Sequence, residues 1–188
     1  KWREPQKLGH HIVLIIGDFT AQIGDASDKG DKRPMLTRAE IDENLKDYKS
    51  QIGKILDLTK IEFVYNNDWL AKLTFGELVK LSECFTVQQM LARRNFKERF
   101  ETQKEISLRE FLYPIMQGYD SVFLKADVEI GGFDQLFNLK AGRIMQDYYG
   151  MKKQHIMTCE MLEGTNGEKM STSQGNVINI VDEPNDMF

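Results

Sequence analysis

Residues 10–18, HHIVLIIGD, contain an uninterrupted apolar run from Ile12 to Ile16 that ends at a glycine and an aspartate. A strand that is buried on both faces of a parallel sheet has this pattern. The segments 61–65 (IEFVY), 128–132 (VEIGG) and 154–160 (QHIMTCE) predict further strands. Helical patterns separate these strands, so the sequence predicts an α/β fold with a doubly wound parallel sheet.

Three capping boxes mark helix starts between the predicted strands. In each, a hydroxyl residue stands three positions before a glutamate, and the two side chains can satisfy backbone N–H groups at the start of a helix. The pairs are Thr37 with Glu40, Thr74 with Glu77, and Ser107 with Glu110. We expect the first pair to open a helix of about five turns. Residues 134–150 predict another helix, which ends at Gly150.

Composition excludes several classes of protein. The chain has 188 residues, of which 41% are hydrophobic, which is enough for one domain or a large piece of one. A net charge of -4 argues against a chain whose main task is to bind nucleic acid unaided. Cys84 and Cys159 have no metal-ligand spacing, and we expect no metal site. Without a signal peptide or a long apolar run, we expect a cytoplasmic protein that does not enter the membrane.

Tyr113, Gln117 and Asp120 form the first candidate binding site. Their spacing places them on one face of the helix that Ser107 opens. A phenol, an amide and a carboxylate on one helix face could together bind an α-amino group. The alternative is a stripe of polar residues that faces solvent.

Two strand ends supply further candidates, because ligands of open α/β sheets bind where strands end and helices begin. Gly131 and Gly132 precede Asp134 and Gln135, although any tight connection can use two glycines. Residues 17–25, GDFTAQIGD, are expected to form an acidic loop after the first strand, and they offer Thr20 and Asp25 as polar candidates.

The segment 168–176, EKMSTSQGN, is the last candidate. Lys169 lies among Ser171, Thr172 and Ser173, and a lysine among hydroxyl groups suits phosphates whose charge shifts during a reaction. A solvated loop would have a similar composition. The chain contains no GxxxxGK[ST] pattern, which argues against a P-loop NTPase.

The order and spacing of these motifs together resemble the catalytic domain of bacterial tyrosyl-tRNA synthetases, which are class I enzymes. KMSTS at 169–173 resembles the KMSKS signature, with threonine in place of its second lysine. YPIMQGYD at 113–120 resembles the tyrosine-recognition helix of that family, and EIGGFDQ at 129–135 resembles its adenosine and substrate loop. The resemblance extends from about Leu8 to the end of the chain.

The resemblance implies a role for each candidate. Asp120 would bind the phenol of tyrosine, while Tyr113 and Gln117 would bind the ammonium group, which changes the residue-based interpretation that all three bind the amino group. Asp25 and Gln135 would complete the tyrosine site. The residues implied for ATP are Thr20, Gly131, Gly132, Asp134, Lys169 and Met170. The residues implied for catalysis, through the departing pyrophosphate, are Lys169, Ser171, Thr172 and Ser173.

The implied reaction is activation of tyrosine by ATP, accompanied by Mg²⁺, and transfer of tyrosine to tRNA(Tyr) by a homodimer. The implied domains are an incomplete Rossmann-like domain over residues 1–160, with a helical insertion at about 74–121, and a KMSKS-type loop over 161–188. The HIGH signature and the anticodon-binding region of the family are absent, so we expect little activity from this stretch alone. The alternatives are a non-catalytic amino-acid-binding module and a tryptophanyl-tRNA synthetase relative, of which Tyr113, Gln117 and Asp120 disfavour the second.

Overall fold

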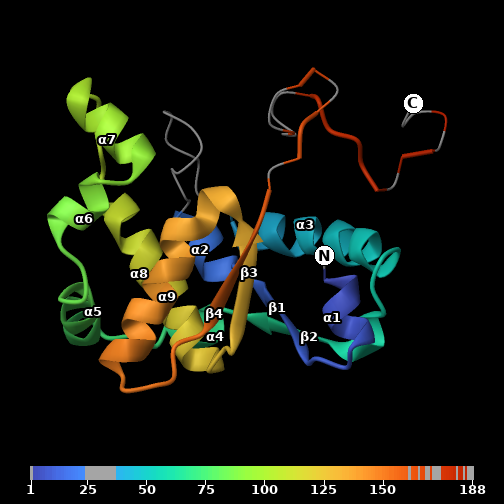
Figure 1. The fold of residues 1–188 in the computed structure, drawn as a ribbon, viewed down its shortest axis with the longest axis horizontal. Coiled ribbons are helices and arrows are strands. Elements are labelled where there is room, and N and C mark those ends of the chain that lie inside the picture. Colours follow the sequence, from blue (N-terminus) through green and yellow to red (C-terminus); the bar gives the residue numbers. More distant parts are fainter. Residues whose placement is uncertain are drawn as a thin grey trace. The chain divides into compact units, whose positions relative to one another are not determined.

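The structure is a computed structural model, and Figure 1 shows its helices and strands. The chain falls into two compact units. The described residues are 2–23, 37–160, 162–164, 166–167, 170, 175–180, 182–183 and 185. The first unit comprises residues 1–16, 38–64 and 160–188, and the second comprises residues 17–37 and 65–159.

The first unit contains a two-stranded sheet and one long helix. Its elements are α1 (Arg3–Lys7), β1 (Ile12–Ile16), α3 (Arg38–Gly53), the short 3-10 helix η1 (Leu58–Lys60) and β2 (Ile61–Tyr65). β1 pairs with β2, and Leu14 of β1 packs with Ile52 of α3 and with Leu56. Both predicted strands and the predicted helix after Thr37 are therefore confirmed.

The expectation that β1 is buried on both faces is wrong at Ile15. Leu14 and Ile16 are buried, but Ile15 is 38% exposed. Successive side chains of a strand point to opposite faces. In the described part of the chain only the face with Leu14 and Ile16 is well covered, so apolar composition alone overstated the burial of this strand.

The second unit is mostly helical and contains a parallel strand pair. Its elements are α2 (Asp18–Ile23), α4 (Asn67–Leu70), α5 (Phe75–Ser82), α6 (Val87–Leu91), α7 (Arg94–Glu101), α8 (Leu108–Leu124), β3 (Val128–Gly132), the 3-10 helix η2 (Phe133–Gln135), α9 (Leu136–Tyr148) and β4 (His155–Cys159). β3 and β4 are parallel, with Val128 opposite His155 and Gly132 opposite Cys159. The strands predicted at 128–132 and 154–160 are thus confirmed.

Local sequence signals explain where several of these helices begin. The reciprocal capping hydrogen bonds predicted for Thr74 with Glu77 and for Ser107 with Glu110 are both present. A third box, Thr86 with Gln89, opens α6. In contrast, the prediction of a loop over 17–25 is wrong for its described part, because α2 begins at Asp18.

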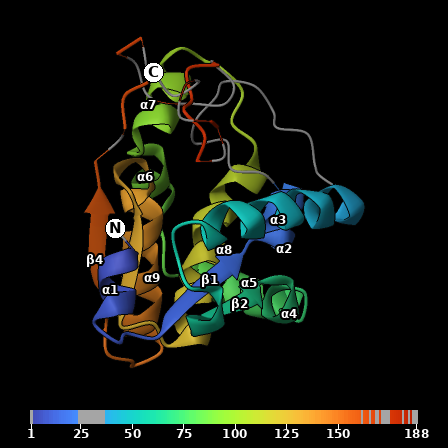
Figure 2. The same ribbon diagram turned by 90° about the vertical axis from the view of Figure 1, so that its right-hand side faces the viewer.

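α8 and α9 lie side by side along much of their length (Figures 1 and 2). Two glycines permit this close approach. A Cβ atom at Gly118 of α8 would lie 2.5 Å from the sulfur of Met145 and 3.1 Å from the backbone of Ala141. A Cβ atom at Gly142 of α9 would collide with the hydroxyl of Ser121. Met145 and Ile115 then join Leu81 and Met90 in the core of this unit.

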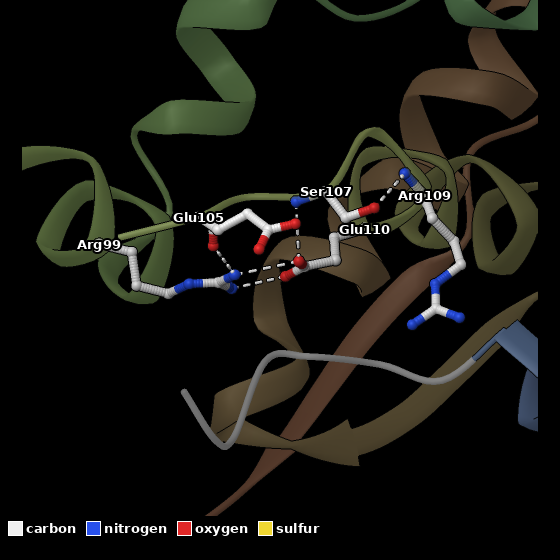
Figure 3. Close-up of polar contacts among 5 residues, drawn as sticks. All are labelled: Arg99, Glu105, Ser107, Arg109 and Glu110. Carbon is white, nitrogen blue, oxygen red and sulfur yellow. Dashed lines mark hydrogen bonds and ion pairs between the residues drawn. The ribbon is translucent and has the colours of Figure 1, made fainter. Parts of the chain in front are cut away.

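A partly buried ion pair connects the N-terminal end of α8 to α7 (Figure 3). Arg99 donates from Nη1 to Glu110 Oε2 at 2.5 Å and from Nη2 to Glu110 Oε1 at 3.0 Å. Arg99 also donates to the carbonyl of Glu105, and the Ser107 N–H donates to Glu110 Oε1 at 3.0 Å. Burial raises the pKa of Glu110, but the hydrogen bonds from Arg99 and Ser107 outweigh it and hold that pKa below its usual value.

Candidate functional site

Asp120 of α8 is the centre of the candidate site in the second unit. Its side chain is 5% exposed. Trp69 donates from Nε1 to Oδ1 at 2.7 Å, and Asn66 donates from Nδ2 to Oδ2 at 3.3 Å. Both donors are uncharged. Burial raises the pKa of Asp120 to about 7, the two hydrogen bonds oppose this rise, and the charge of Glu129 adds to it.

Trp69 is held in place by stacking. Its ring lies 4.5 Å from the ring of Phe123 of α8, with an angle of 15° between the planes. α4, which carries Trp69, is fixed at its start because the N–H of Asn67 donates to Asp18 Oδ1 at 3.0 Å. The indole donor is therefore positioned by the protein before any ligand binds.

Asn66 connects Asp120 to the start of α2. Its Oδ1 accepts from the N–H of Phe19 at 3.0 Å, and its Nδ2 donates to Thr20 Oγ1 at 3.2 Å as well as to Asp120. Asn66 is 1% exposed, and Thr20 and Asp18 are also buried. Thr20, a candidate that follows β1, and Asp120 are thus both hydrogen-bonded to the side chain of Asn66.

Gln117 lies on the same helix and contacts a second carboxylate. Its Nε2 donates to Glu129 Oε1 of β3 at 3.3 Å. Tyr113 and Gln117 are half-buried and Asp120 is buried. The alternative of a solvent-facing stripe is therefore wrong for this face of α8.

Glu129 receives three protein donors. Besides Gln117, Ser121 Oγ donates to Oε2 at 3.0 Å and Gln154 Nε2 donates to Oε2 at 2.5 Å. Burial raises the pKa of Glu129, and the three hydrogen bonds oppose that rise. A carboxylate that accepts three hydrogen bonds can hold the donating side chains in a fixed orientation.

The two glycines of the predicted turn belong to the carboxyl end of β3, and η2 follows them directly. Gly131 and Gly132 end the strand, and the half-buried Asp134 and Gln135 lie in η2. Gln135 Oε1 accepts from Asn138 Nδ2 at 2.9 Å, and Asn138 is buried in α9. The amide of Gln135 is therefore oriented by α9.

Five predicted site residues, Asp25, Lys169, Ser171, Thr172 and Ser173, lie outside the described residues. Met170 is described and belongs to the first unit, where its N–H donates to the carbonyl of Leu162 at 2.9 Å. Among the described candidates, Thr20 and Asp120 both accept from Asn66, and Gln117 donates to Glu129 of β3, the strand that ends in Gly131 and Gly132.

Three residues of this site were missed from the sequence: Asn66, Trp69 and Glu129. The first two follow the end of β2, where polar residues are candidates in any open α/β sheet. Glu129 is a single charge in an otherwise apolar strand. These signals were available, but they do not name the partners.

Across the described ranges, no group of three His, Cys, Asp or Glu side chains is arranged to hold a metal ion. Cys84 and Cys159 are free thiols. None of the helices in the described part of the chain has the length and apolar character that crossing a bilayer requires.

The sequence is similar to a known family over its whole length. The family model described as tRNA synthetases class I (W and Y) matches residues 1–188. The tyrosine--tRNA ligase of Carboxydothermus hydrogenoformans is 51% identical over 189 residues, and covers 100% of this chain and 46% of the relative. The tyrosine--tRNA ligase of Thermotoga maritima is 50% identical, and the match covers 100% of this chain and 47% of that relative. The chain spans about half the length of these curated relatives.

Solved structures have the same fold. Tyrosyl-tRNA synthetase from Archaeoglobus fulgidus, complexed with L-tyrosine, matches with a TM-score of 0.72 at 26% identity, over 96% of this chain and 54% of that one. Tryptophanyl-tRNA synthetase from Campylobacter jejuni matches with a TM-score of 0.68 at 18% identity, over 99% of this chain and 57% of that one. The predicted α/β fold of a class I synthetase catalytic domain is confirmed.

Proposed function

We propose a function for this chain, which belongs to the family of class I tRNA synthetases for tryptophan and tyrosine. The chain activates L-tyrosine with ATP, as part of a tyrosine--tRNA ligase. The observation that carries this choice of amino acid is the buried carboxylate of Asp120, which has two uncharged donors, Trp69 and Asn66.

Asp120 recognises the phenol of the substrate. Trp69 and Asn66 each occupy one oxygen of the carboxylate, and each oxygen has a further lone pair. The phenol O–H donates to one of these lone pairs. Phenylalanine offers no donor, so it would leave a buried carboxylate without its third partner, which is unfavourable.

The ammonium group of tyrosine is bound by Tyr113 and Gln117, with Asp25 and Gln135 completing this part of the site. Tyr113 and Gln117 precede Asp120 along one face of α8, so a ligand along that face meets phenol-binding and ammonium-binding groups in turn. The family resemblance supports the assignments of Asp25 and Gln135.

ATP, which enzymes of this family use as a substrate, is bound at the carboxyl ends of the strands. The residues proposed for it are Thr20, Gly131, Gly132, Asp134, Lys169 and Met170. Mg²⁺ bound to ATP would balance the charge of its phosphates. Lys169, Ser171, Thr172 and Ser173 stabilise the pyrophosphate as it leaves.

The reaction requires no protein nucleophile. A carboxylate oxygen of tyrosine attacks the α-phosphorus of ATP, and the bond to the bridging oxygen of pyrophosphate breaks. A ribose hydroxyl of tRNA(Tyr) then takes the tyrosyl group from the adenylate and releases AMP. Positioning and charge stabilisation supply the rate. The homodimer, the cytoplasmic location and the domain division at residue 160 belong to the same proposal.

Tyrosine-dependent exchange of labelled pyrophosphate into ATP tests this function. The protein to use is the longest reading frame that contains the chain. We expect exchange with tyrosine and little with tryptophan or phenylalanine. Tyrosine binding without exchange would favour a non-catalytic module, and exchange with tryptophan would favour the tryptophanyl alternative.

Substitution of Lys169 tests the phosphate side of the proposal. Lys169→Ala should depress pyrophosphate exchange far more than tyrosine binding, because its charge acts on the leaving group. Lys97→Ala is a matched control, since Lys97 is an exposed lysine of α7 that pairs only loosely with Glu101 at 3.9 Å. Equal loss of exchange and of tyrosine binding in the Lys169 variant would contradict this role.

A further inference from the structure

We propose that Glu129 is a positioning residue that sets the polarity of the Gln117 amide, so that Gln117 offers its oxygen to the substrate ammonium. The inference rests on the proposed function and deepens it. It assigns a role in amino-acid recognition to a β3 side chain.

The contact between the two side chains allows only one amide orientation while Glu129 is ionised. A carboxylate accepts hydrogen bonds and has no proton to donate. The group of Gln117 that lies 3.3 Å from Glu129 Oε1 is therefore the NH₂ group. The amide oxygen of Gln117 is on the opposite side of the same planar group, directed away from Glu129.

This orientation matches the chemistry of an ammonium group. An ammonium carries only donors, so it needs an oxygen as partner. A reversed amide would present its own NH₂ group to the ammonium and would repel it. Asp120, one turn further along α8, is proposed to bind the other end of tyrosine, so the polarity of Gln117 affects the amino end alone.

Glu129 is itself held rigidly, as a positioning residue must be. Its Oε2 accepts from Ser121 at 3.0 Å and from Gln154 at 2.5 Å. Gln154 is 1% exposed. Its N–H donates to Gln146 Oε1 at 2.6 Å, and Gln146 donates to the carbonyls of Ser121 and Ala126.

This network joins α8, α9 and the two strands around one carboxylate. Ser121 belongs to α8, Gln146 to α9, and Gln154 directly precedes β4. The position of Glu129 relative to α8 is thus fixed by contacts that do not involve Gln117. Glu129 therefore stays in place when the Gln117 side chain rotates, and its carboxylate determines which way the amide points.

The test compares two ligands that differ only in the amino group: tyrosine and 3-(4-hydroxyphenyl)propionate. Glu129→Gln keeps the size of the side chain but permits either orientation of the Gln117 amide. In the longest reading frame that contains the chain, we expect Glu129→Gln to weaken tyrosine binding about tenfold or more and to change binding of the analogue less than about twofold.

Two further variants keep the test decisive if Glu129→Gln folds poorly. Glu129→Asp retains the charge but withdraws it from Gln117, so a smaller loss, again confined to tyrosine, is expected. Glu129→Gln in a Gln117→Met background should cause no further loss of tyrosine affinity, because the amide that it orients has gone.

Equal weakening of both ligands, or additive effects of the two substitutions, would show a purely structural role and overturn the inference. Unchanged tyrosine affinity in Glu129→Gln would do the same. A wild-type protein that binds neither ligand would instead overturn the proposed function, so the two failures are distinguishable.

Discussion

α8 carries two buried carboxylates that differ in their neighbours and in their pKa values. Glu110, in its first turn, is 4% exposed, and Asp120, near its other end, is 5% exposed. Burial raises the pKa of both. At Glu110 the guanidinium of Arg99 and the N–H of Ser107 reverse the effect, while at Asp120 two uncharged donors leave the pKa at about 7.

The difference separates a structural carboxylate from a binding one. Arg99 donates to both oxygens of Glu110 and supplies a full opposite charge, so this carboxylate is compensated without a ligand. Trp69 and Asn66 supply donors to Asp120 without a charge. A hydrogen-bond donor of a ligand can therefore improve the environment of Asp120 more than that of Glu110.

Arg99→Met should have the largest effect on stability. Arg99 is partly buried and Glu110 is buried, so loss of Arg99 leaves the charge of Glu110 uncompensated. We expect a loss of about 3 kcal/mol, the lower end of the range for buried ion pairs. Urea unfolding at pH 7 measures it. Because the pKa of folded Glu110 is lowered, the stabilisation is present above its unfolded value of 4.5 and is lost as the pH falls through the folded pKa.

Lys97→Met is the control for Arg99→Met. Lys97 lies on the same helix, but its side chain is exposed and its ion pair with Glu101 is 3.9 Å long. Its substitution should change the free energy of unfolding by less than about 0.5 kcal/mol. Similar losses in the two variants would contradict a structural role of the Arg99–Glu110 pair.

Asp120→Asn should remove a pH dependence of stability whose sign is opposite to that of Glu110. The pKa of Asp120 rises from 3.8 to about 7 on folding, so between these values the folded state keeps a proton that the unfolded state has released. The free energy of unfolding of the wild type should therefore fall relative to the variant as the pH rises from about 4 to about 7, by on the order of 4 kcal/mol. A constant difference across this range, measured by urea unfolding, would contradict the assignment.

Trp69→Phe should have a smaller effect. It removes the indole donor, which lies 2.7 Å from Asp120, and keeps an aromatic ring to stack on Phe123. Loss of a hydrogen bond to a charged group should destabilise the protein at pH 8 by about 1 to 3 kcal/mol. The pKa of Asp120, followed by NMR, should rise above its present value of about 7, and an unchanged pKa would show that the indole does not stabilise the ionised form.

Sequence predicted the local structure of α8 well and its tertiary contacts poorly. The capping box of Ser107 with Glu110 defined where the helix begins, and helical spacing placed Tyr113, Gln117 and Asp120 on one face. Neither signal reveals that Trp69 and Asn66 meet Asp120, because these residues are more than fifty positions away along the chain. Side-chain partners of this kind depend on packing between elements.

Two other errors have similar causes. Residues 17–25 resemble a loop in composition, since glycine and aspartate occur at both ends, yet α2 begins at Asp18. Its start is stabilised by tertiary contacts, because Asn66 accepts from the N–H of Phe19. The apolar run of β1 likewise predicted full burial, and Ile15 shows that an apolar side chain need not be covered.

Discrimination between tyrosine and phenylalanine by Asp120→Asn tests the central claim most directly. The measurement is the ratio of kcat/KM for the two amino acids in pyrophosphate exchange, in the longest reading frame that contains the chain. If Asp120 accepts from the substrate phenol, the ratio should fall by about tenfold or more, because an amide replaces the charged acceptor. An unchanged ratio in a folded variant would contradict the claim that this carboxylate recognises the substrate.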